Sequence, residues 1–348
     1  MKRNAYTPIG KMIVFALLVA ALLTGCAAPV ATSQPTQPAA VQPTAGQATA
    51  TTQPAQTEAT AAPSATTAAA APTATTAPAA QQPAAGKADT LVYATNISDL
   101  ITLDPAQMYA WTGILTVNNL YQGLVRFEGT DYSSVKPALA EKWDIQKTAA
   151  GYDLTFTLKD GIKFASGNPV TADDVGYSYQ RVVTLKKGPS FLFTDIAGLT
   201  DQSFKATDPK TVVISLPKTF SPQVFLSILT FTVGSVVDSK EVKSHEASGD
   251  LGSTWLQDHS AGSGPYVLDH WTKETEILLK ANPNYTGAQP AIPNVLIQHV
   301  LESTNQQFGL ENGDIDIARN LSPEQVAALQ GKPDVTTSKG NSQLIVYI

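Results

Sequence analysis

Apolar and polar side chains alternate at every position of Tyr152–Leu158, the pattern of a strand that is buried on one face. Lys159-Asp160-Gly161 follows as a turn signal, because Gly161 can adopt a positive φ that would strain other residues. The apolar residues Ile162 and Phe164 then predict a short returning strand. This part of the chain therefore predicts a strand, a turn and a second strand.

A helix is predicted to begin at Thr171, after the chain-breaking sequence Gly167-Asn168-Pro169. The Thr171 hydroxyl can cap the amide of Asp174, and Asp173 and Asp174 suit the positive end of the helix dipole. Apolar residues then recur at helical spacing on one side: Val175, Tyr179, Val182 and Val183. The segment predicts an amphipathic helix.

Similar signals predict further elements along the chain. Strands are expected at residues 91–94, 211–216, 276–280, 295–300 and 343–348. Three more helices are expected where a capping residue precedes proline: one from Asp104-Pro105 to Gly123, one from Ser221-Pro222, and one from Ser322-Pro323 to Gly331.

The N-terminus reads as an export signal. Three basic residues precede or flank Met12–Leu23, an apolar run too short for a comfortable membrane span. The run ends in Leu23-Thr24-Gly25-Cys26, which matches the bacterial lipobox, so residues 1–26 are predicted to be a lipoprotein signal peptide with Cys26 as the lipidated residue. Several acyl chains on one residue would anchor the protein stably to the outer face of the cell membrane. The alternative is an ordinary signal peptide with a chance cysteine.

Residues 27–87 consist almost entirely of Ala, Thr, Pro and Gln. Nothing in this stretch can pack, so ordering it would cost conformational entropy with no burial to offset that cost. We expect a disordered tether with a root-mean-square span on the order of 45 Å.

The charge balance excludes one class of partner, and the cysteine count excludes disulfides and cysteine-based metal sites. The whole chain carries 23 basic and 29 acidic side chains, and all but four of the basic and one of the acidic ones follow residue 87. This acidic balance argues against nucleic acid as a partner. Cys26 is the single cysteine, so the chain can form neither an internal disulfide nor a cysteine-based zinc site.

The strand–turn–helix region resembles the signature of the family 5 bacterial solute-binding proteins, the extracytoplasmic receptors of peptide and nickel ABC importers. The matching positions are Ala140, Trp143, Tyr152, Phe156, Leu158, Lys159, Gly161, Ile162, Phe164, Gly167, Pro169, Val170, Thr171, Ala172, Asp174 and Val175. Shorter stretches also resemble the family: Leu103-Asp104-Pro105, Tyr121–Val125 with Gln122 in place of the usual acid, Gly262–Tyr266, and Leu310–Ala318. The resemblance covers about residues 91–348.

This resemblance implies an α/β protein with the periplasmic-binding-protein type II fold. Its main lobe would comprise residues 88–121 and 260–348, with residues 122–259 as an inserted subdomain. In the family, a strand such as Gln343–Ile348 precedes the crossover to a second lobe, so we expect the chain to be a fragment that largely lacks that lobe. The implied function is that of a monomeric substrate-binding component that delivers a small solute, with peptide favoured, to an ABC permease in the cytoplasmic membrane.

The resemblance also implies three ligand-binding residues. Tyr109 and Trp111 are the fourth and sixth residues after Leu103-Asp104-Pro105, positions that approach bound peptide in oligopeptide receptors. Phe191 lies near another contact region of the family. The alternative is that the two aromatic residues pack against the core or the second lobe. Oligopeptide receptors can carry an acid where Tyr109 stands, which weakens the case for a peptide ligand.

No motif for enzymatic chemistry is found. Gly262-Ser263-Gly264 leads into proline and a strand instead of a helix, so it is not a nucleophile elbow. The four histidines are scattered, the acids at 173 and 174 fit helix capping, and those at 314 and 316 fit the solvent side of a strand edge. We expect no catalytic residue, metal site or cofactor. A receptor for a nickel chelate or an oligosaccharide, and a surface adhesion or structural lipoprotein, remain alternatives.

Overall fold

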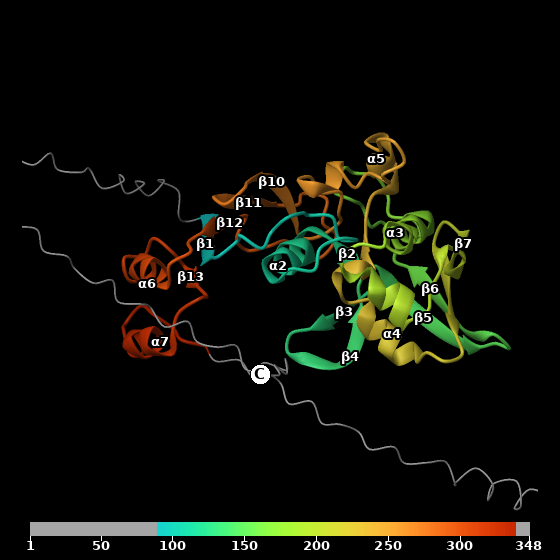
Figure 1. Ribbon diagram of the computed structural model, residues 1–348, viewed down its shortest axis with the longest axis horizontal. Helices are drawn as coiled ribbons and strands as arrows, with labels where there is room; N and C mark the ends of the chain where they lie inside the picture. Colours follow the sequence, from blue (N-terminus) through green and yellow to red (C-terminus); the bar gives the residue numbers. More distant parts are fainter. Residues whose placement is uncertain (1–88, 339–348) are drawn as a thin grey trace, which may run out of the picture. The chain divides into compact units, whose positions relative to one another are not determined.

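Two separate β-sheets organise residues 89–338, the part of the chain that the computed structural model describes (Figure 1). The predicted signal peptide, Cys26, the predicted tether and the strand predicted at 343–348 lie outside the described residues.

The first sheet has five strands in the order β10-β11-β12-β1-β13. Their bounds are Thr90–Thr95 (β1), Tyr266–Thr272 (β10), Glu276–Ala281 (β11), Asn294–His299 (β12) and Ile317–Ala318 (β13). Strand β1 runs parallel to both β12 and β13, with Tyr93 opposite Ile297 on one side and Ile317 on the other. Helix α2 (Trp111–Leu120) buries Val117 and Leu120 in the core beneath this sheet.

The second sheet is antiparallel, in the order β5-β6-β8-β7. Its strands are Ala140–Lys147 (β5), Gly151–Leu158 (β6), Phe204–Asp208 (β7) and Thr211–Pro217 (β8), and helix α3 (Ala172–Leu185) packs against it. The predicted alternation is confirmed, since Leu154, Phe156 and Leu158 of β6 are all buried. Val175 and Tyr179 of α3 complete the same core.

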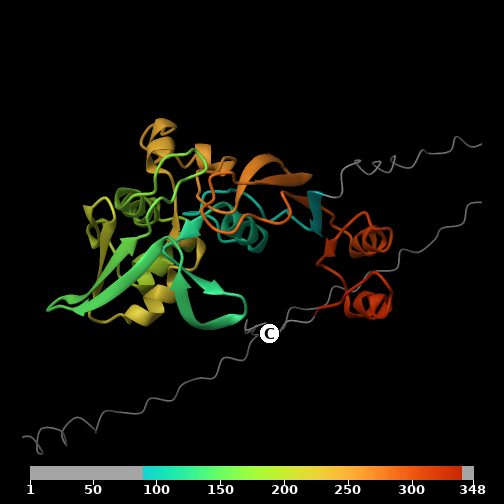
Figure 2. The same cartoon turned by 180° about the vertical axis from the view of Figure 1, so that it is seen from behind.

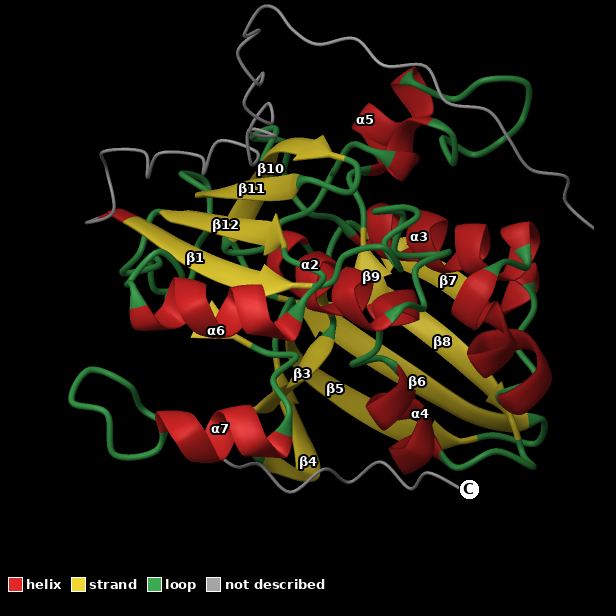
Figure 3. Ribbon diagram, turned by 60° about the vertical axis from the view of Figure 1, so that its left-hand side comes forward, coloured by secondary structure: helices red, strands yellow, loops and turns green. Residues whose placement is uncertain are grey.

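The remaining elements connect and flank the two sheets (Figures 2 and 3). The short strand β2 (Gln122–Gly123) pairs with β9 (Ser235–Val236), and β3 (Val125–Glu128) forms a hairpin with β4 (Asp131–Pro137). The other α-helices are α4 (Pro222–Ile228), α5 (Ser239–Ser244), α6 (Ser303–Glu311) and α7 (Pro323–Leu329). Helix α6 lies next to β1, with α7 beyond it (Figure 3).

The helix starts predicted at Thr171, Ser221 and Ser322 are confirmed, because each of these residues is the N-cap of an α-helix. At Thr171 the capping pair is completed by the Asp174 carboxylate, which accepts from the Thr171 backbone N–H at 2.8 Å and from its hydroxyl at 2.7 Å.

Two predicted elements are wrong. Helix α2 begins at Trp111, not at Pro105, because the Asp104 carboxylate is buried in an ion pair and closes only a turn, where it accepts from the N–H of Ala106. Gly123, where this helix was expected to end, belongs to β2, and a Cβ there would lie 2.8 Å from the carbonyl oxygen of Gly234.

The second element is the short strand expected at Ile162 and Phe164. Residues 162–164 form no strand, only an isolated bridge between Lys163 and Pro169.

A buried ion pair joins the two cores. The guanidinium of Arg181, on α3, donates to both carboxylate oxygens of Asp104 at 3.0 and 2.8 Å, and its Nε donates to the carbonyl of Leu251 at 2.8 Å. The two side chains are 1% and 0% exposed. Burial alone would lower the pKa of Arg181, but the adjacent Asp104 carboxylate outweighs it and the pKa is raised.

Replacing Arg181 by methionine should destabilise the protein by about 3–5 kcal/mol, because the Asp104 carboxylate would remain buried without its counter-charge. Urea unfolding of the full chain measures this change. The matched control is Arg126→Met, which removes an exposed pair with Glu128 and should alter the free energy of unfolding by less than about 1 kcal/mol. Equal losses in the two variants would contradict a special role for the buried pair.

Candidate functional site

The loop before α2 is held rigidly on both sides of Met108. The Met108 N–H donates to the carbonyl of Asp104 at 2.8 Å, and the Met108 carbonyl accepts from the buried Thr232 hydroxyl at 2.9 Å. Asp104 is itself fixed by Arg181. The backbone that carries Tyr109, the next residue, is therefore set by the buried ion pair and its neighbours.

Three aromatic rings meet at this loop. The Tyr109 ring lies 5.8 Å from that of Phe191 in an edge-to-face arrangement and 6.0 Å from that of Phe231, measured between ring centroids. Tyr109 nevertheless remains 53% exposed, so the contacts orient its ring without covering it. The structure thus brings together Tyr109 and Phe191 from the sequence prediction and adds Phe231, which lies in a loop after α4 where no local pattern marks it.

Gly188 fixes the loop that carries Phe191. Its φ is +43°, and a Cβ at this position would lie 2.1 Å from the carbonyl oxygen of Gln107. The backbone of the 3-10 helix Gly188–Ser190 therefore touches the backbone of the Tyr109 loop directly. This close approach places Phe191 against Tyr109.

Trp111 is the first residue of α2 and is 62% exposed. The next residue, Thr112, anchors it, because its N–H donates to the carboxylate of Asp99 at 3.2 Å and its hydroxyl donates to the carbonyl of Asn96 at 3.1 Å. Within residues 89–338 the Trp111 ring makes no ring–ring contact. Instead the guanidinium carbon of Arg319 lies 4.5 Å from its centroid.

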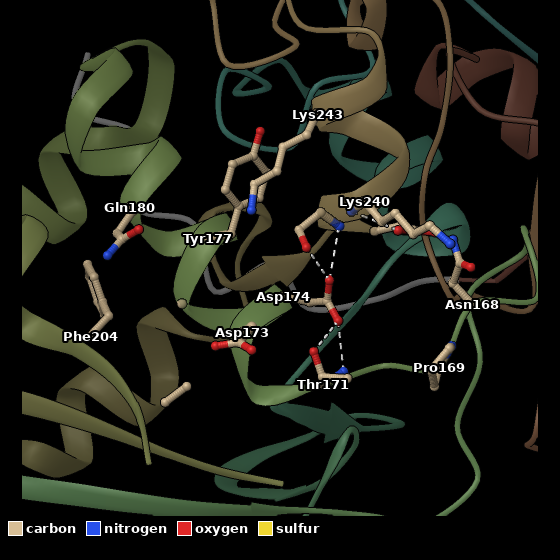
Figure 4. Close-up of a pocket in the computed structure, with 14 residues that line it drawn as sticks. Asn168, Pro169, Thr171, Asp173, Asp174, Tyr177, Gln180, Phe204, Lys240 and Lys243 are labelled. Carbon is tan, nitrogen blue, oxygen red and sulfur yellow. Dashed lines mark hydrogen bonds between the residues drawn. The ribbon is translucent and has the colours of Figure 1, made fainter. Parts of the chain in front are cut away.

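A recess of about 640 Å³ lies between α3 and α5 (Figure 4). Two of its three carboxylates serve structural hydrogen bonds. Asp174 accepts from the N–H and hydroxyl of Ser239 at 3.0 and 2.6 Å, and Asp238 accepts from the side chains of Ser166 and Asn168. This recess contains none of the predicted ligand-binding residues, and Asp174 and Asp238 hold its loops together.

No three His, Cys, Asp or Glu side chains converge to hold a metal ion in the described part of the chain. Among its helices, none is both long enough and apolar enough to cross a membrane.

Comparison with known proteins identifies the family. The sequence pattern of "Bacterial extracellular solute-binding proteins, family 5 Middle" matches residues 134–348. The chain belongs to this family. The family 5 protein is 34% identical over 272 residues to the "Probable D,D-dipeptide-binding periplasmic protein DdpA" of Escherichia coli (strain K12), a match that covers 76% of this chain and 50% of the relative.

Solved structures confirm the predicted type II periplasmic-binding-protein fold. Helicobacter pylori DppA in complex with the peptide STSA has a TM-score of 0.59 at 24% identity, covering 70% of this chain and 49% of that one. MoaA of A. tumefaciens R10, in complex with mannopinic acid, has a TM-score of 0.62 at 25% identity, covering 70% and 48%. The family 5 chain thus spans about half the length of the relatives it matches. The domain boundaries inferred from the sequence stay a prediction.

Replacing Gly188 by alanine should destabilise this family 5 protein by roughly 2–4 kcal/mol. Strain in the left-handed region contributes about 1 kcal/mol, and the clash with the backbone of Gln107 adds about 1–3 kcal/mol. Gly161→Ala is the matched control, since Gly161 also has a positive φ but a Cβ there would meet nothing within 4 Å. Urea unfolding of both variants measures the difference. Equal destabilisation would show that Gly188 is not needed for the contact between the two loops.

Proposed function

We propose that this protein is the substrate-binding component of an ABC import system that captures small peptides without covalent chemistry. The supporting observation is an aromatic face in which the exposed Tyr109 and Trp111 stand on one fixed segment of chain and the half-buried Phe191 packs against Tyr109. Cys26 would anchor the protein by lipid to the outer face of the cell membrane, and a permease in that membrane would receive the solute. The protein would act as a monomer and catalyse no reaction.

The exposed rings suit a binding surface. Burial of a large aromatic side chain is favourable. Tyr109 and Trp111, which are 53% and 62% exposed, therefore leave apolar area for a partner to cover. Small-molecule sites in proteins are mostly apolar, with a few polar groups that orient the ligand. Hydrogen bonds and the Gly188 contact already hold the surrounding backbone. Ordering this face would therefore subtract little from the free energy of binding.

Similarity to the D,D-dipeptide-binding relative makes dipeptides the first solutes to test. Relatives named for other solutes match at lower identity: a probable deoxycholate-binding protein at 28% and a nickel-binding protein at 24%, both of Escherichia coli. In the proposed mechanism a second lobe closes over the dipeptide in a hinge motion, and the closed form docks on the permease.

The full chain should bind dipeptides, and differential scanning calorimetry tests this directly. A ligand at 100 times its Kd stabilises the folded state by about 2.7 kcal/mol, so L-Ala-L-Ala or D-Ala-D-Ala should raise the melting temperature. Maltotriose and the nickel complex of L-histidine should leave it unchanged. A response to one of these two probes alone would make the protein a receptor for that solute. A folded chain that responds to none of the four would favour an adhesion or structural lipoprotein.

Tyr109→Ala should weaken dipeptide binding at least about tenfold, equivalent to 1.4 kcal/mol, because the ligand would lose the ring that Phe191 and Phe231 orient. Tyr109→Phe retains the ring and should bind within about threefold of the parent chain. Isothermal titration calorimetry gives both affinities, and the unliganded melting temperatures show whether the variants fold. Equal affinity in all three proteins would place the peptide elsewhere.

A further inference from the structure

Arg319 differs from the other arginines of residues 89–338. Arg126 pairs with Glu128 at 3.4 Å, and Arg181 pairs with Asp104 at 2.8 Å. Arg319 forms no ion pair with any described residue, although acidic side chains outnumber basic ones in this part of the chain. The exposed guanidinium of Arg319 therefore carries a positive charge that no described carboxylate pairs with.

The backbone of Arg319 is fixed by a buried side chain. The carboxamide oxygen of Gln306, which is 0% exposed, accepts from the N–H groups of both Arg319 and Asn320 at 3.2 Å. The Gln306 amide nitrogen donates to the carbonyl of Val300 at 2.7 Å. In addition, the Asn320 side-chain oxygen accepts from the Thr95 hydroxyl at 2.9 Å. The chain that follows β13 is thereby held against the end of β1.

The side chain of Arg319 is held over an aromatic ring. Its guanidinium carbon lies 4.5 Å from the centroid of Trp111, a cation–π contact, and its Nη1 donates to the Tyr93 hydroxyl at 3.4 Å. A guanidinium carries five N–H donors, and this is the one protein acceptor that its side chain finds among residues 89–338. Most of its donors therefore remain available in a fixed place.

The guanidinium also lies close to the aromatic face. Strands β1 and β13 run parallel, so Arg319 follows the carboxyl end of β13, the edge at which ligands bind in many α/β sheets. Trp111 follows Tyr109 by two residues, a separation of at most about 7 Å along the backbone. Because Arg319 lies over the Trp111 ring, its guanidinium is placed near the loop that carries Tyr109.

We infer that Arg319 is a specificity-determining residue that binds the carboxylate of the solute, with Trp111 as the platform that positions the guanidinium. The planar guanidinium matches a carboxylate with two parallel N–H···O bonds, which a neutral amide cannot reproduce. The chemical class favoured is a small amino-acid-derived solute with a free carboxylate. This inference rests on the proposed function and adds to it the group of the peptide that is recognised.

Isothermal titration calorimetry with Ala-Ala and its C-terminal amide, Ala-Ala-NH2, tests the inference in the full chain. The parent protein should bind the acid at least about tenfold more tightly than the amide, and Arg319→Gln should remove this preference by weakening only the acid. Arg319→Lys should retain part of the preference, because it keeps the charge but loses the bidentate geometry. Lys142→Gln, which removes one positive charge from the exposed face of β5, should leave the preference unchanged.

The outcomes separate the two proposals. Equal affinity of the parent chain for the acid and the amide, or an unchanged preference in Arg319→Gln, would overturn the role of Arg319 while leaving the peptide-binding function in place. Failure of the parent chain to bind either compound would overturn the peptide-binding function, and the carboxylate role with it. An unliganded melting temperature in Arg319→Gln equal to that of the parent would show that any loss reflects recognition and not folding.

Discussion

The buried ion pair between Arg181 and Asp104 is the interaction on which the arrangement of the candidate site depends. Taking two charges out of water is costly, so such a pair persists only when its partners are well placed and further hydrogen bonds satisfy them. Here the pair joins α3, which belongs to the core of the second sheet, to the loop that precedes α2 in the core of the first. Because the same loop continues into Tyr109 and Trp111, the electrostatic link between the cores also fixes the exposed aromatic face.

The candidate site combines rigid support with unused surface. Met108, Gly188 and Gln306 provide the support through buried hydrogen bonds and backbone contacts, and none of the three has to touch a solute. Tyr109 and Trp111 provide the exposed surface. The residues that hold the backbone are thus different from those that are exposed on the surface. The exposed side chains can therefore be substituted, and binding specificity changed, without loss of the fold.

The sequence predicted those parts of the structure that depend on local patterns. Strand β6 follows from alternation and the start of α3 from the Thr171–Asp174 cap, and both are local signals. Asp104 was misread as a helix cap because its partner, Arg181, lies 77 residues away in the sequence. Tyr109 and Phe191 were found through family resemblance. The sequence does not indicate Arg319, because the parallel pairing of β1 with β13 brings it to Trp111. This pairing joins distant parts of the chain, and no local periodicity predicts it.

Strand β13 is joined to β1 through only two residue pairs, Tyr93 with Ile317 and Ala94 with Ala318. The Gln306 carboxamide holds the two amides that follow, and hydrogen bonds from β1 to Asn320 and Asp316 add to this support. Local opening of this edge would break these hydrogen bonds and expose one small apolar cluster (Val92, Ala94 and Ile315), so it requires less free energy than global unfolding. A solute carboxylate bound to Arg319 would require this sheet edge to be closed, so occupancy of the site would be coupled to the closed state of the edge.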